Sequence, residues 1–488
     1  IKFRFMKYKV NPYNLLIPIW EQNEFLLYNT FNGGIEILDL DSGLFLSEVT
    51  TLDNFTLPDY NTHEPLIDEL YEKEYLIDSS INFIAEAERR YLNEITNKAQ
   101  KNIFLTIGTT ILCNMGCPYC FEFVKPNNTL KDERIIKQVG KYIESIILKN
   151  PQNPWENLNV TWYGGEPLMN VKAIKLLSPI LKKICLKFNL KYNASIITNG
   201  IYLTPENVKL LLENDVFDAQ VTLDGSRETH NRNRPLKAKN QKNYEKILEN
   251  LSILPKEMGV NLRVNIDRNV ANSLNELLDD LQEYEIWPHR YKNFQFSPAW
   301  LRTYDGEEIS EEEKESRLIV DEFFEIYQNF RLKQITAFNK WAKDKNIKNA
   351  KLGWDLPSYQ TDCPTWASPY GIVVDPNGLI HKCWETIHDE KQACSNVFDE
   401  YEPESFKEYT SYNRYQINPV CRNCKFLPVC DQVSCSHHAV NHKVPQCTYW
   451  KSKSEDFIKN QYVRMIEYPE TINTPANVAA VNTGHSNK

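Results

Sequence analysis

The alternation of strand-like and helix-like segments between residues 102 and 297 limits most strongly what this chain can fold into. Six runs with strand composition, from "NIFLTIG" to "YKNFQFSP", are separated by five segments with helical periodicity, such as "DERIIKQVGKYIESIIL". Strands that alternate with helices in this way form parallel βαβ units with right-handed crossovers. The sequence therefore predicts an α/β core with a parallel sheet, and ligands of such sheets bind beyond the carboxyl ends of the strands.

Chemically distinctive segments directly follow several of these predicted strands. The first is "CNMGCPYC", which carries Cys113, Cys117 and Cys120 in a C-x3-C-x2-C arrangement. The later strand ends carry Gly164, Gly165, Glu166 and Pro167, then Thr198 and Asn199, and then Asp224. Three clustered thiols fit an iron–sulfur cluster that keeps one iron open for another ligand. A zinc site is the alternative, although a fourth ligand at matching spacing is missing nearby.

Composition narrows the class of protein. The chain has 488 residues, twelve cysteines and a net charge of -9, which argues against a nucleic-acid-binding surface. Its apolar stretches are shorter than the ~20 residues of a membrane-spanning helix, and no signal-peptide pattern opens the chain. These features predict a cytoplasmic protein with no nucleic-acid or membrane partner. In that compartment cysteines serve metal binding more often than disulfides, while Cys185, in an apolar helical stripe, is expected in the core.

The cysteine triplet, with Tyr119 before its last cysteine, resembles the CxxxCxxC signature of the radical S-adenosylmethionine (radical SAM) superfamily. The resemblance implies a partial (β/α)6 barrel and a 4Fe–4S cluster whose open iron binds SAM. One-electron cleavage of SAM would then yield a 5′-deoxyadenosyl radical that abstracts a substrate hydrogen. The electron would come from a donor such as flavodoxin or ferredoxin.

Further segments resemble the SAM-binding motifs of that superfamily. "YGGEP", Tyr163–Pro167, is similar to the GGEP motif, whose oxygens receive the SAM ammonium. "ITNG" is similar to the segment that lines the ribose, which implies cofactor contacts for Thr198 and Asn199. Asp224, in "TLDGS", is a candidate for a ribose ligand, a catalytic base or a simple turn cap. Arg263, on an alternating strand, suits the methionyl carboxylate and is a second catalytic candidate.

Eight more cysteines lie between residues 363 and 447, and seven of them resemble the pattern of the SPASM domain. The resemblance implies two auxiliary 4Fe–4S clusters, and so three clusters in all. The implied ligands are Cys363, Cys383 and Cys435 for the first auxiliary cluster, and Cys421, Cys424, Cys430 and Cys447 for the second. One departure is the spacing of four residues, instead of three, before Cys435.

The ligand set of the first auxiliary cluster is incomplete in this pattern. Some relatives carry an extra cysteine just before the first one, but residues 353–362 contain none. The cluster could keep an open iron, or use Cys394 or a ligand other than cysteine. Cys394 lies outside the pattern and is expected to be a bystander. Because histidines crowd the same region, zinc remains an alternative here as well.

These patterns together predict the domain organisation. The predicted parts are a winged-helix-like peptide-recognition domain at 1–90, the radical SAM core at 100–300, a helical bridge at 301–355, the SPASM domain at 356–450, and a C-terminal helix with a disordered tail at 451–488. The resemblance to SPASM-containing radical SAM enzymes implies a peptide-modifying enzyme that acts on a ribosomal precursor peptide with a leader sequence.

The expected reaction is thioether formation from a peptide cysteine, because an open auxiliary iron could bind a substrate thiolate. A carbon–carbon crosslinking peptide maturase would use the same parts, and a sulfatase-type maturase that forms formylglycine is a further alternative. A non-enzymatic electron-transfer protein is the alternative from another class, but it would leave the polar residues at the strand ends without a purpose.

Overall fold

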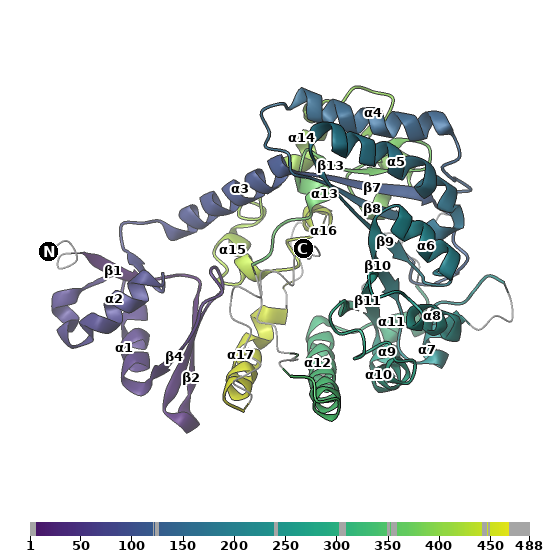
Figure 1. Ribbon diagram of the computed structural model, residues 1–488. Helices are drawn as coiled ribbons and strands as arrows, with labels where there is room; N and C mark the ends of the chain where they lie inside the picture. Colours follow the sequence, from purple (N-terminus) through teal and green to yellow (C-terminus); the bar gives the residue numbers. More distant parts are fainter. Residues whose placement is uncertain are drawn as a thin grey trace. The chain divides into compact units, whose positions relative to one another are not determined.

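The computed structural model describes residues 6–120, 122, 126–238, 243–301, 309–348, 352, 359–441, 447 and 449–467 (Figure 1). The chain divides into two compact units. The first unit comprises Thr96–Gln334 and Cys363–Ser411, and the second comprises Ile1–Ile95, Ile335–Asp362 and Tyr412–Lys488. The predicted disordered tail beyond residue 467 lies outside the described residues.

A nine-stranded sheet organises the first unit, in the order β12-β11-β10-β9-β8-β7-β13-β14-β15. Its strands are β7 (Asn102–Thr110), β8 (Asn157–Gly164), β9 (Lys191–Thr198), β10 (Val216–Thr222), β11 (Gly259–Ile266), β12 (Phe294–Trp300), β13 (Gly371–Val374), β14 (Leu379–His381) and β15 (Ser395–Asn396). The strands from β7 to β12 pair in parallel with their neighbours. This confirms the predicted α/β fold with a parallel sheet.

Helices connect the parallel strands, as the alternation predicts. They are α4 (Glu133–Lys149), α5 (Val171–Phe188), α6 (Pro205–Glu213), α7 (Arg227–Asn233), α8 (Asn243–Ser252), α9 (Arg268–Ala271) and α10 (Leu274–Glu283), with the short η4 (Pro167–Asn170) before α5. In α4, Asp132 caps the first turn, and apolar residues three and four positions apart form the buried face. A Cβ on Gly140 would lie 2.6 Å from the Ile180 side chain, so α4 and α5 pack closely. Cys185 on α5 is 4% exposed, which confirms it as a core residue.

The cysteine-rich segment contributes strands to the same sheet, which its sequence did not indicate. β13 pairs in parallel with β7, and β14 and β15 continue the sheet in antiparallel pairing. These strands have only two to four residues, too few to leave a recognisable periodicity in the sequence. Gly378, with φ of 86°, closes the turn between β13 and β14.

The second unit begins with two small antiparallel sheets. One has the order β5-β1-β6 and the other β2-β3-β4. The elements are β1 (Lys7–Val10), β2 (Asn14–Ile19), η2 (Trp20–Gln22), β3 (Glu24–Asn29), β4 (Ile35–Asp39), α1 (Leu40–Thr50), β5 (Phe55–Thr56), η3 (Leu57–His63), α2 (Glu64–Glu72) and β6 (Leu76–Asp78). A core of mostly aromatic and leucine side chains, including Tyr8, Phe25, Phe45 and Leu70, lies among these sheets and helices.

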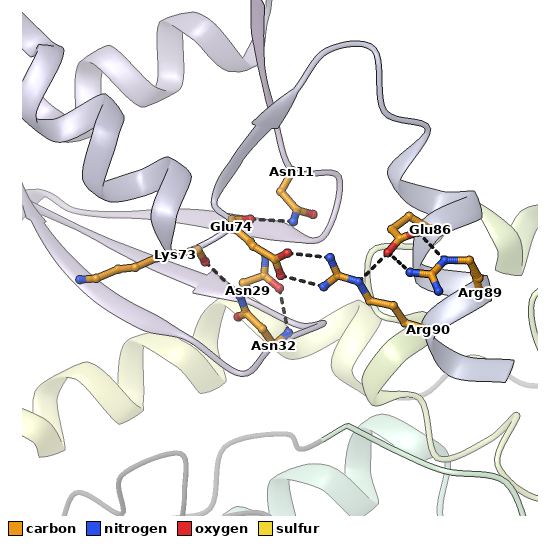
Figure 2. Close-up of polar contacts among 8 residues, drawn as sticks. All are labelled: Asn11, Asn29, Asn32, Lys73, Glu74, Glu86, Arg89 and Arg90. Carbon is orange, nitrogen blue, oxygen red and sulfur yellow. Dashed lines mark hydrogen bonds and ion pairs between the residues drawn. The ribbon is translucent and has the colours of Figure 1, made fainter. Parts of the chain in front are cut away.

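A polar network fastens helix α3 (Phe83–Lys101) to the turn that follows α2 (Figure 2). The Arg90 guanidinium makes two hydrogen bonds of 2.9 and 2.7 Å to the Glu74 carboxylate and a third of 2.9 Å to Glu86. The Glu74 carbonyl oxygen accepts a hydrogen bond from Asn11. The same guanidinium lies over the rings of Phe31 and Phe83. Side chains from two segments outside the helix, Glu74 and Phe31, therefore hold α3 in place.

The N-terminal elements and the later cysteine-rich segment share one hydrophobic core within the second unit. Tyr13, Phe83 and Tyr91 are buried together with Tyr415, Leu427 and Val433, which are more than three hundred residues away in the sequence. Three half-buried cysteines that belong to the predicted second auxiliary site pack against this core. Part of the N-terminal region is therefore packed against residues 415–433 within this unit.

A buried ion pair stabilises the same unit. The Arg414 guanidinium donates two hydrogen bonds of 2.9 and 2.7 Å to one oxygen of Asp362, and both side chains are 1% exposed. The Tyr91 hydroxyl donates to the other oxygen of Asp362. The Arg414 guanidinium also lies 5.5 Å from the centroid of the Tyr91 ring. Three distant segments thus meet at one buried carboxylate.

Replacing Asp362 by Asn is expected to destabilise the second unit by about 3–5 kcal/mol, because the buried Arg414 charge loses its only recorded anion among the described residues. Urea denaturation followed by circular dichroism measures the effect. Glu69→Gln is the matched control, since Glu69 and its partner Lys73 are both exposed and such a pair is worth about 1 kcal/mol or less. Equal unfolding midpoints for the two variants would contradict the prediction.

The remaining elements are short, apart from two long helices. They are α11 (Glu311–Ser316), α12 (Val320–Asp344), α13 (Pro364–Ala367), η5 (Trp384–Thr386), η6 (Glu390–Gln392), η7 (Pro403–Phe406), α14 (Lys407–Thr410), α15 (Pro419–Arg422), η8 (Leu427–Val429), α16 (Ser436–Asn441) and α17 (Tyr449–Glu467). α11 and α12 lie in the predicted helical bridge, of which residues 302–308, 349–351 and 353–358 are outside the described part. Among the described helices, none is both long and apolar enough to cross a membrane.

Candidate functional site

The four distinctive segments follow four neighbouring parallel strands and therefore lie at one edge of the sheet. The cysteine loop follows β7, the Gly-Gly turn follows β8, Asn199 follows β9 and Asp224 follows β10. In a parallel sheet all carboxyl ends point the same way, so these segments meet. Hydrogen bonds join each of these segments to at least one other, so the predicted convergence is present.

The cysteine loop is held by backbone pairing with a segment after α7. The Gly116 N–H donates to the Pro235 carbonyl over 2.8 Å, and the Lys237 N–H donates to the Asn114 carbonyl over 2.8 Å. Met115 and Leu236 form an antiparallel bridge between these two contacts. A loop without helix or strand structure of its own is therefore fixed by a short ladder of hydrogen bonds.

The three thiols of this loop fit an iron–sulfur cluster by the chemistry of their surroundings. Cys113, Cys117 and Cys120 are half-buried, and none of them forms a disulfide. The sulfur of Cys113 accepts from the Met115 N–H at 3.4 Å and from the Asn199 amide at 3.8 Å. Hydrogen bonds to sulfur favour the thiolate form that a cluster requires. The donor set thus matches a cluster, and its ligand role stays a prediction.

Gly164 and Gly165 bring the end of β8 against the chain that leads into the cysteine loop. Gly164 has φ of 120°, and a Cβ there would lie 2.1 Å from the Thr110 carbonyl oxygen. A Cβ on Gly165 would lie 2.4 Å from the Ile111 carbonyl oxygen. Only glycine permits so close an approach of two backbones. The Gly165 N–H completes the contact by donating to the Thr110 oxygen over 2.9 Å.

Glu166 is expected to contact the SAM ammonium. In the structure its carboxylate accepts hydrogen bonds from other residues of the protein. One oxygen accepts from the Leu168 N–H at 3.0 Å and the Thr198 hydroxyl at 2.8 Å, and the other accepts from the Asn199 N–H at 2.8 Å. The side chain is fully buried, and burial raises the pKa of its carboxyl group. Glu166 therefore joins the end of β8 to the end of β9. The next residue, Pro167, is the first residue of η4.

Tyr119 and Asp224 meet in a buried network that the sequence did not fully predict. The Tyr119 hydroxyl donates to one oxygen of Asp224 and accepts from the Arg234 guanidinium at 2.8 Å. The other oxygen of Asp224 accepts from the Asn265 N–H at 2.9 Å. Since both oxygens bind groups on other segments, the reading of Asp224 as a cap of its own turn is not what the structure shows. Arg263 joins the network because it donates to the Asn265 amide oxygen at 2.8 Å.

Burial and charge set the ionisation of this network. Burial raises the pKa of Asp224, and the nearby Arg234 guanidinium opposes that rise. The pKa of Tyr119 is raised, mainly by burial, so its hydroxyl keeps its proton at neutral pH. Burial lowers the pKa of His230 well below its usual value, and its Nδ1 accepts the Asp224 N–H over 3.1 Å as a neutral ring does.

The cysteines of the predicted auxiliary sites are distributed over both units. Those of the first unit are Cys363, Cys383 and Cys394, and those of the second are Cys421, Cys424, Cys430, Cys435 and Cys447. In the second unit, the Cys424 N–H donates to the Cys421 carbonyl over 3.0 Å, and the pKa of Cys421 is raised by burial and then by the thiols of Cys424 and Cys447. The structure thus brings together three of the four residues that are predicted for the second auxiliary cluster.

The sequence analysis did not predict that Arg234, His230 and Asn265 belong to the site. Arg234 and His230 are four residues apart at the end of a short helix, in the polar run "RETHNRNRPLK". Such a run reads as a solvated surface, yet Arg234 is only 9% exposed. The available signal was the spacing of a His and an Arg by one helical turn, shortly after Asp224-Gly225.

Comparison with known proteins bears on this site. Residues 107–281 match the family model described as the Radical SAM superfamily. The chain is 25% identical to "Radical SAM cyclopropyl synthase TigE" of Paramaledivibacter caminithermalis, over 93% of this chain and 94% of that protein. It is 26% identical to the "Serine-type anaerobic sulfatase-maturating enzyme" of Bacteroides thetaiotaomicron, over 66% of this chain and 79% of that protein.

A solved structure shares the fold. It is the tagged form of anSMEcpe with bound AdoMet, at a TM-score of 0.57 and 19% identity, over 78% of this chain and 98% of that one. At this identity the likeness concerns the fold alone. The match extends beyond the residues of the family model, so the fold of this chain resembles that enzyme over most of its length.

Proposed function

Since the chain belongs to the radical SAM superfamily and is an enzyme, we propose that it modifies a ribosomally made precursor peptide by abstracting a hydrogen atom from it. The observation that carries this proposal is the meeting of the cysteine loop, the Gly-Gly turn and the Tyr119–Asp224–Arg234 network at one edge of the parallel sheet. An electron-transfer protein needs no such polar set beside its cysteines.

We assign the cofactor contacts as follows. Cys113, Cys117 and Cys120 would hold a 4Fe–4S cluster, which together with SAM would supply a carbon-centred radical for hydrogen abstraction. The backbone oxygens of Gly164 and Gly165 would hold the SAM ammonium, because the Glu166 carboxylate already accepts hydrogen bonds from three internal donors. Thr198 and Pro167 act together with Glu166 by fixing the positions of the Gly-Gly turn after β8 and of the end of β9.

The remaining polar residues are proposed to bind the other end of the cofactor and to act in catalysis. Asn199 already contacts Cys113 and lies beside the cluster site. Arg263 is half-buried on β11, and Asn265 is its recorded side-chain partner among the described residues, so its terminal nitrogens suit a carboxylate. Asp224, held by Tyr119 and Asn265, is the group in position to bind the ribose or to accept a substrate proton.

The peptide substrate is supported by the relatives. The sulfatase-maturating relative is named for action on a protein, and anSMEcpe is also known with the bound peptide Cp18Cys. The predicted winged-helix-like recognition domain at 1–90 and the predicted SPASM cysteines at 356–450 belong to this proposal, as do two auxiliary clusters and a flavodoxin- or ferredoxin-type electron donor.

Two bonds are candidates for the product. Thioether formation from a peptide cysteine follows from the prediction of an open auxiliary iron. A carbon–carbon bond is favoured by the similarity to a cyclopropyl synthase along nearly the whole chain. The two outcomes differ in whether a cysteine thiol of the peptide is consumed.

The test uses the full-length enzyme, reconstituted with iron and sulfide without oxygen, and a peptide encoded by a small open reading frame beside its gene. With SAM and dithionite, the expected products are 5′-deoxyadenosine and a peptide that has lost two hydrogen atoms. Labelling with iodoacetamide then separates the bonds, because a thioether blocks the cysteine and a carbon–carbon bond leaves it reactive. An unmodified peptide under conditions that form 5′-deoxyadenosine would exclude that peptide as the substrate, and unmodified peptides from all neighbouring frames would refute the proposal.

Leader binding is proposed at the open edge of β4. Among the described residues β4 pairs only with β3, and the Ile37 side chain is 42% exposed. The Asn29 N–H donates to the Gly34 carbonyl, so the alternation of an antiparallel ladder directs the N–H groups of Ile35 and Ile37 away from β3. The opposite edge strand, β2, contains Pro18, which lacks a donor. An extended leader can therefore add as a strand along β4.

Ile37→Pro is expected to weaken precursor binding at least tenfold, because it removes one outward donor from that edge. Fluorescence anisotropy with a labelled precursor peptide measures the affinity. Ile37→Val is the matched control, since it keeps both the N–H and the β-branched shape. Formation of 5′-deoxyadenosine without peptide should not change. Equal affinities for the two variants, with equal thermal stability, would refute leader binding at β4.

A further inference from the structure

Two predicted auxiliary cysteines are brought together by the hairpin at the end of the large sheet. β13 and β14 pair in an antiparallel register, with Val373 opposite His381 and Val374 opposite Ile380, and Cys383 lies two residues beyond the end of β14. A Cβ on Gly371 would lie 2.2 Å from the Pro364 carbonyl oxygen, so the segment that begins at Cys363 lies directly against this strand. Cys363 and Cys383 therefore flank the same short piece of backbone.

Cys394 lies next to β15, the strand that pairs with the other side of β14, and so approaches the same end of β14. It immediately precedes β15, and its N–H donates to the Ile380 carbonyl over 2.8 Å. Its sulfur lies 3.2 Å from that same oxygen, three residues before Cys383. The Tyr409 hydroxyl is close enough to the thiols of both Cys394 and Cys383 to be affected electrostatically by each. Three cysteines thus gather at one end of the hairpin, although only two of them belong to the SPASM pattern.

A buried lysine accompanies them. Lys382 is 1% exposed, and its Nζ donates to the carbonyl oxygens of Ser368, at 2.6 Å, and Gly371. Its Nζ lies 5.0 Å from the centroid of the Phe406 ring. All these partners are neutral, and burial lowers the pKa of Lys382 to about 7, while the thiols of Cys394 and Cys363 oppose that fall. A buried ammonium group is costly unless an anion lies nearby.

We propose that Cys394 is a ligand of the same iron–sulfur site as Cys363 and Cys383, and that Lys382 is the buried counter-cation of that site. The inference rests on the auxiliary-cluster part of the proposed function. On ligation each thiol releases its proton to solvent, and the resulting negative charge lies beside the Lys382 ammonium. Cys394 then supplies a ligand that the SPASM pattern leaves out at this site.

The first test isolates the auxiliary sites in the full-length protein by replacing Cys113, Cys117 and Cys120 with alanine. In that background, Cys394→Ala is expected to remove up to about four irons, or to convert one cluster to a 3Fe–4S form with its own EPR signal. The matched control is Cys185→Ala, which removes a buried thiol of the same unit that lies on α5. Iron content and EPR spectra equal to those of the control would overturn the assignment of Cys394.

The second test concerns the charge on Lys382. Lys382→Met is expected to lower the midpoint potential of one auxiliary cluster, because the reduced form carries more negative charge and loses its cation. Lys382→Arg should keep the potential, and Lys391→Met, at an exposed lysine nearby, should not change it. Redox titration followed by EPR measures each variant. A potential unchanged in Lys382→Met, in a protein that still binds its iron, would overturn the role as counter-cation. Loss of iron in Lys382→Met but not in Lys382→Arg supports it.

These outcomes are distinct from failure of the proposed function. Cys394→Ala in the otherwise unchanged enzyme should still form 5′-deoxyadenosine, because the SAM-binding residues lie on other strands. If the iron results hold and no peptide is modified, the ligand assignment stands and the peptide proposal fails. If peptide modification is normal and Cys394→Ala keeps all its iron, the peptide proposal stands and the ligand assignment fails.

Discussion

Replacing Cys113, Cys117 and Cys120 together by alanine is expected to remove about four of about twelve irons and to abolish SAM cleavage. The three thiols are the only cysteines on the loop that meets the Gly-Gly turn, and no other described cysteine belongs to that strand end. Iron determination and the chromatographic detection of 5′-deoxyadenosine after dithionite reduction measure the two effects.

Cys185→Ala serves as the control, because it removes a thiol that is buried in the helical layer. It should keep both the iron and the cleavage activity. If the triple variant lost cleavage but kept all its iron, the triplet would not be a cluster site. If it lost iron but still cleaved SAM, the cofactor would have to bind elsewhere.

Gly165→Ala is expected to reduce SAM cleavage at least ~100-fold with little loss of iron, since a displacement of about 1 Å at a reacting centre costs that much. The new Cβ would lie 2.4 Å from the Ile111 oxygen and 2.5 Å from the Leu112 oxygen, far inside ordinary contact distance. Both atoms belong to the backbone that leads into the cysteine loop. The turn after β8 must therefore move away from the cluster site.

Gly116→Ala provides a matched control on the cysteine loop itself. The nearest atom to a Cβ there is the Lys237 Cγ, at 4.0 Å, so the methyl group fits without displacement. Its initial rate of 5′-deoxyadenosine formation should stay within a few-fold of the unchanged enzyme. Similar rates for the two variants would mean that the close approach of Gly165 does not position the cofactor.

The parts of the fold that could be predicted from the sequence are those with a long periodic signal. Strands such as β7, with nine residues, and helices such as α4, with seventeen, bury enough side chains to leave a regular pattern. Their order alone placed the cysteine loop and Asp224 at one edge. β13 has only four residues, and its position in the sheet is set by pairing with β7. No local sequence pattern encodes that pairing.

The site was predictable where residues carry chemistry in a local motif, and not where they act through distant contacts. Arg234 contacts Tyr119, which lies 115 positions earlier, and its own neighbours resemble a solvated surface. Glu166 has the residue type of a cofactor ligand, but only the structure shows that three protein donors already satisfy its carboxylate. Partner choice of this kind depends on tertiary packing, which a single sequence does not reveal.

The core that Tyr13 and Phe83 share with Tyr415 and Leu427 limits how this enzyme could be recombined with its relatives. A chimera that receives another protein's residues 6–80 would place foreign side chains against the segment that holds Cys421, Cys424 and Cys430. The natural unit of exchange is therefore discontinuous, and consists of the N-terminal elements together with residues 412–433. Substitutions along β4, where leader binding is proposed, avoid this constraint, because no β4 residue is among the described members of that core.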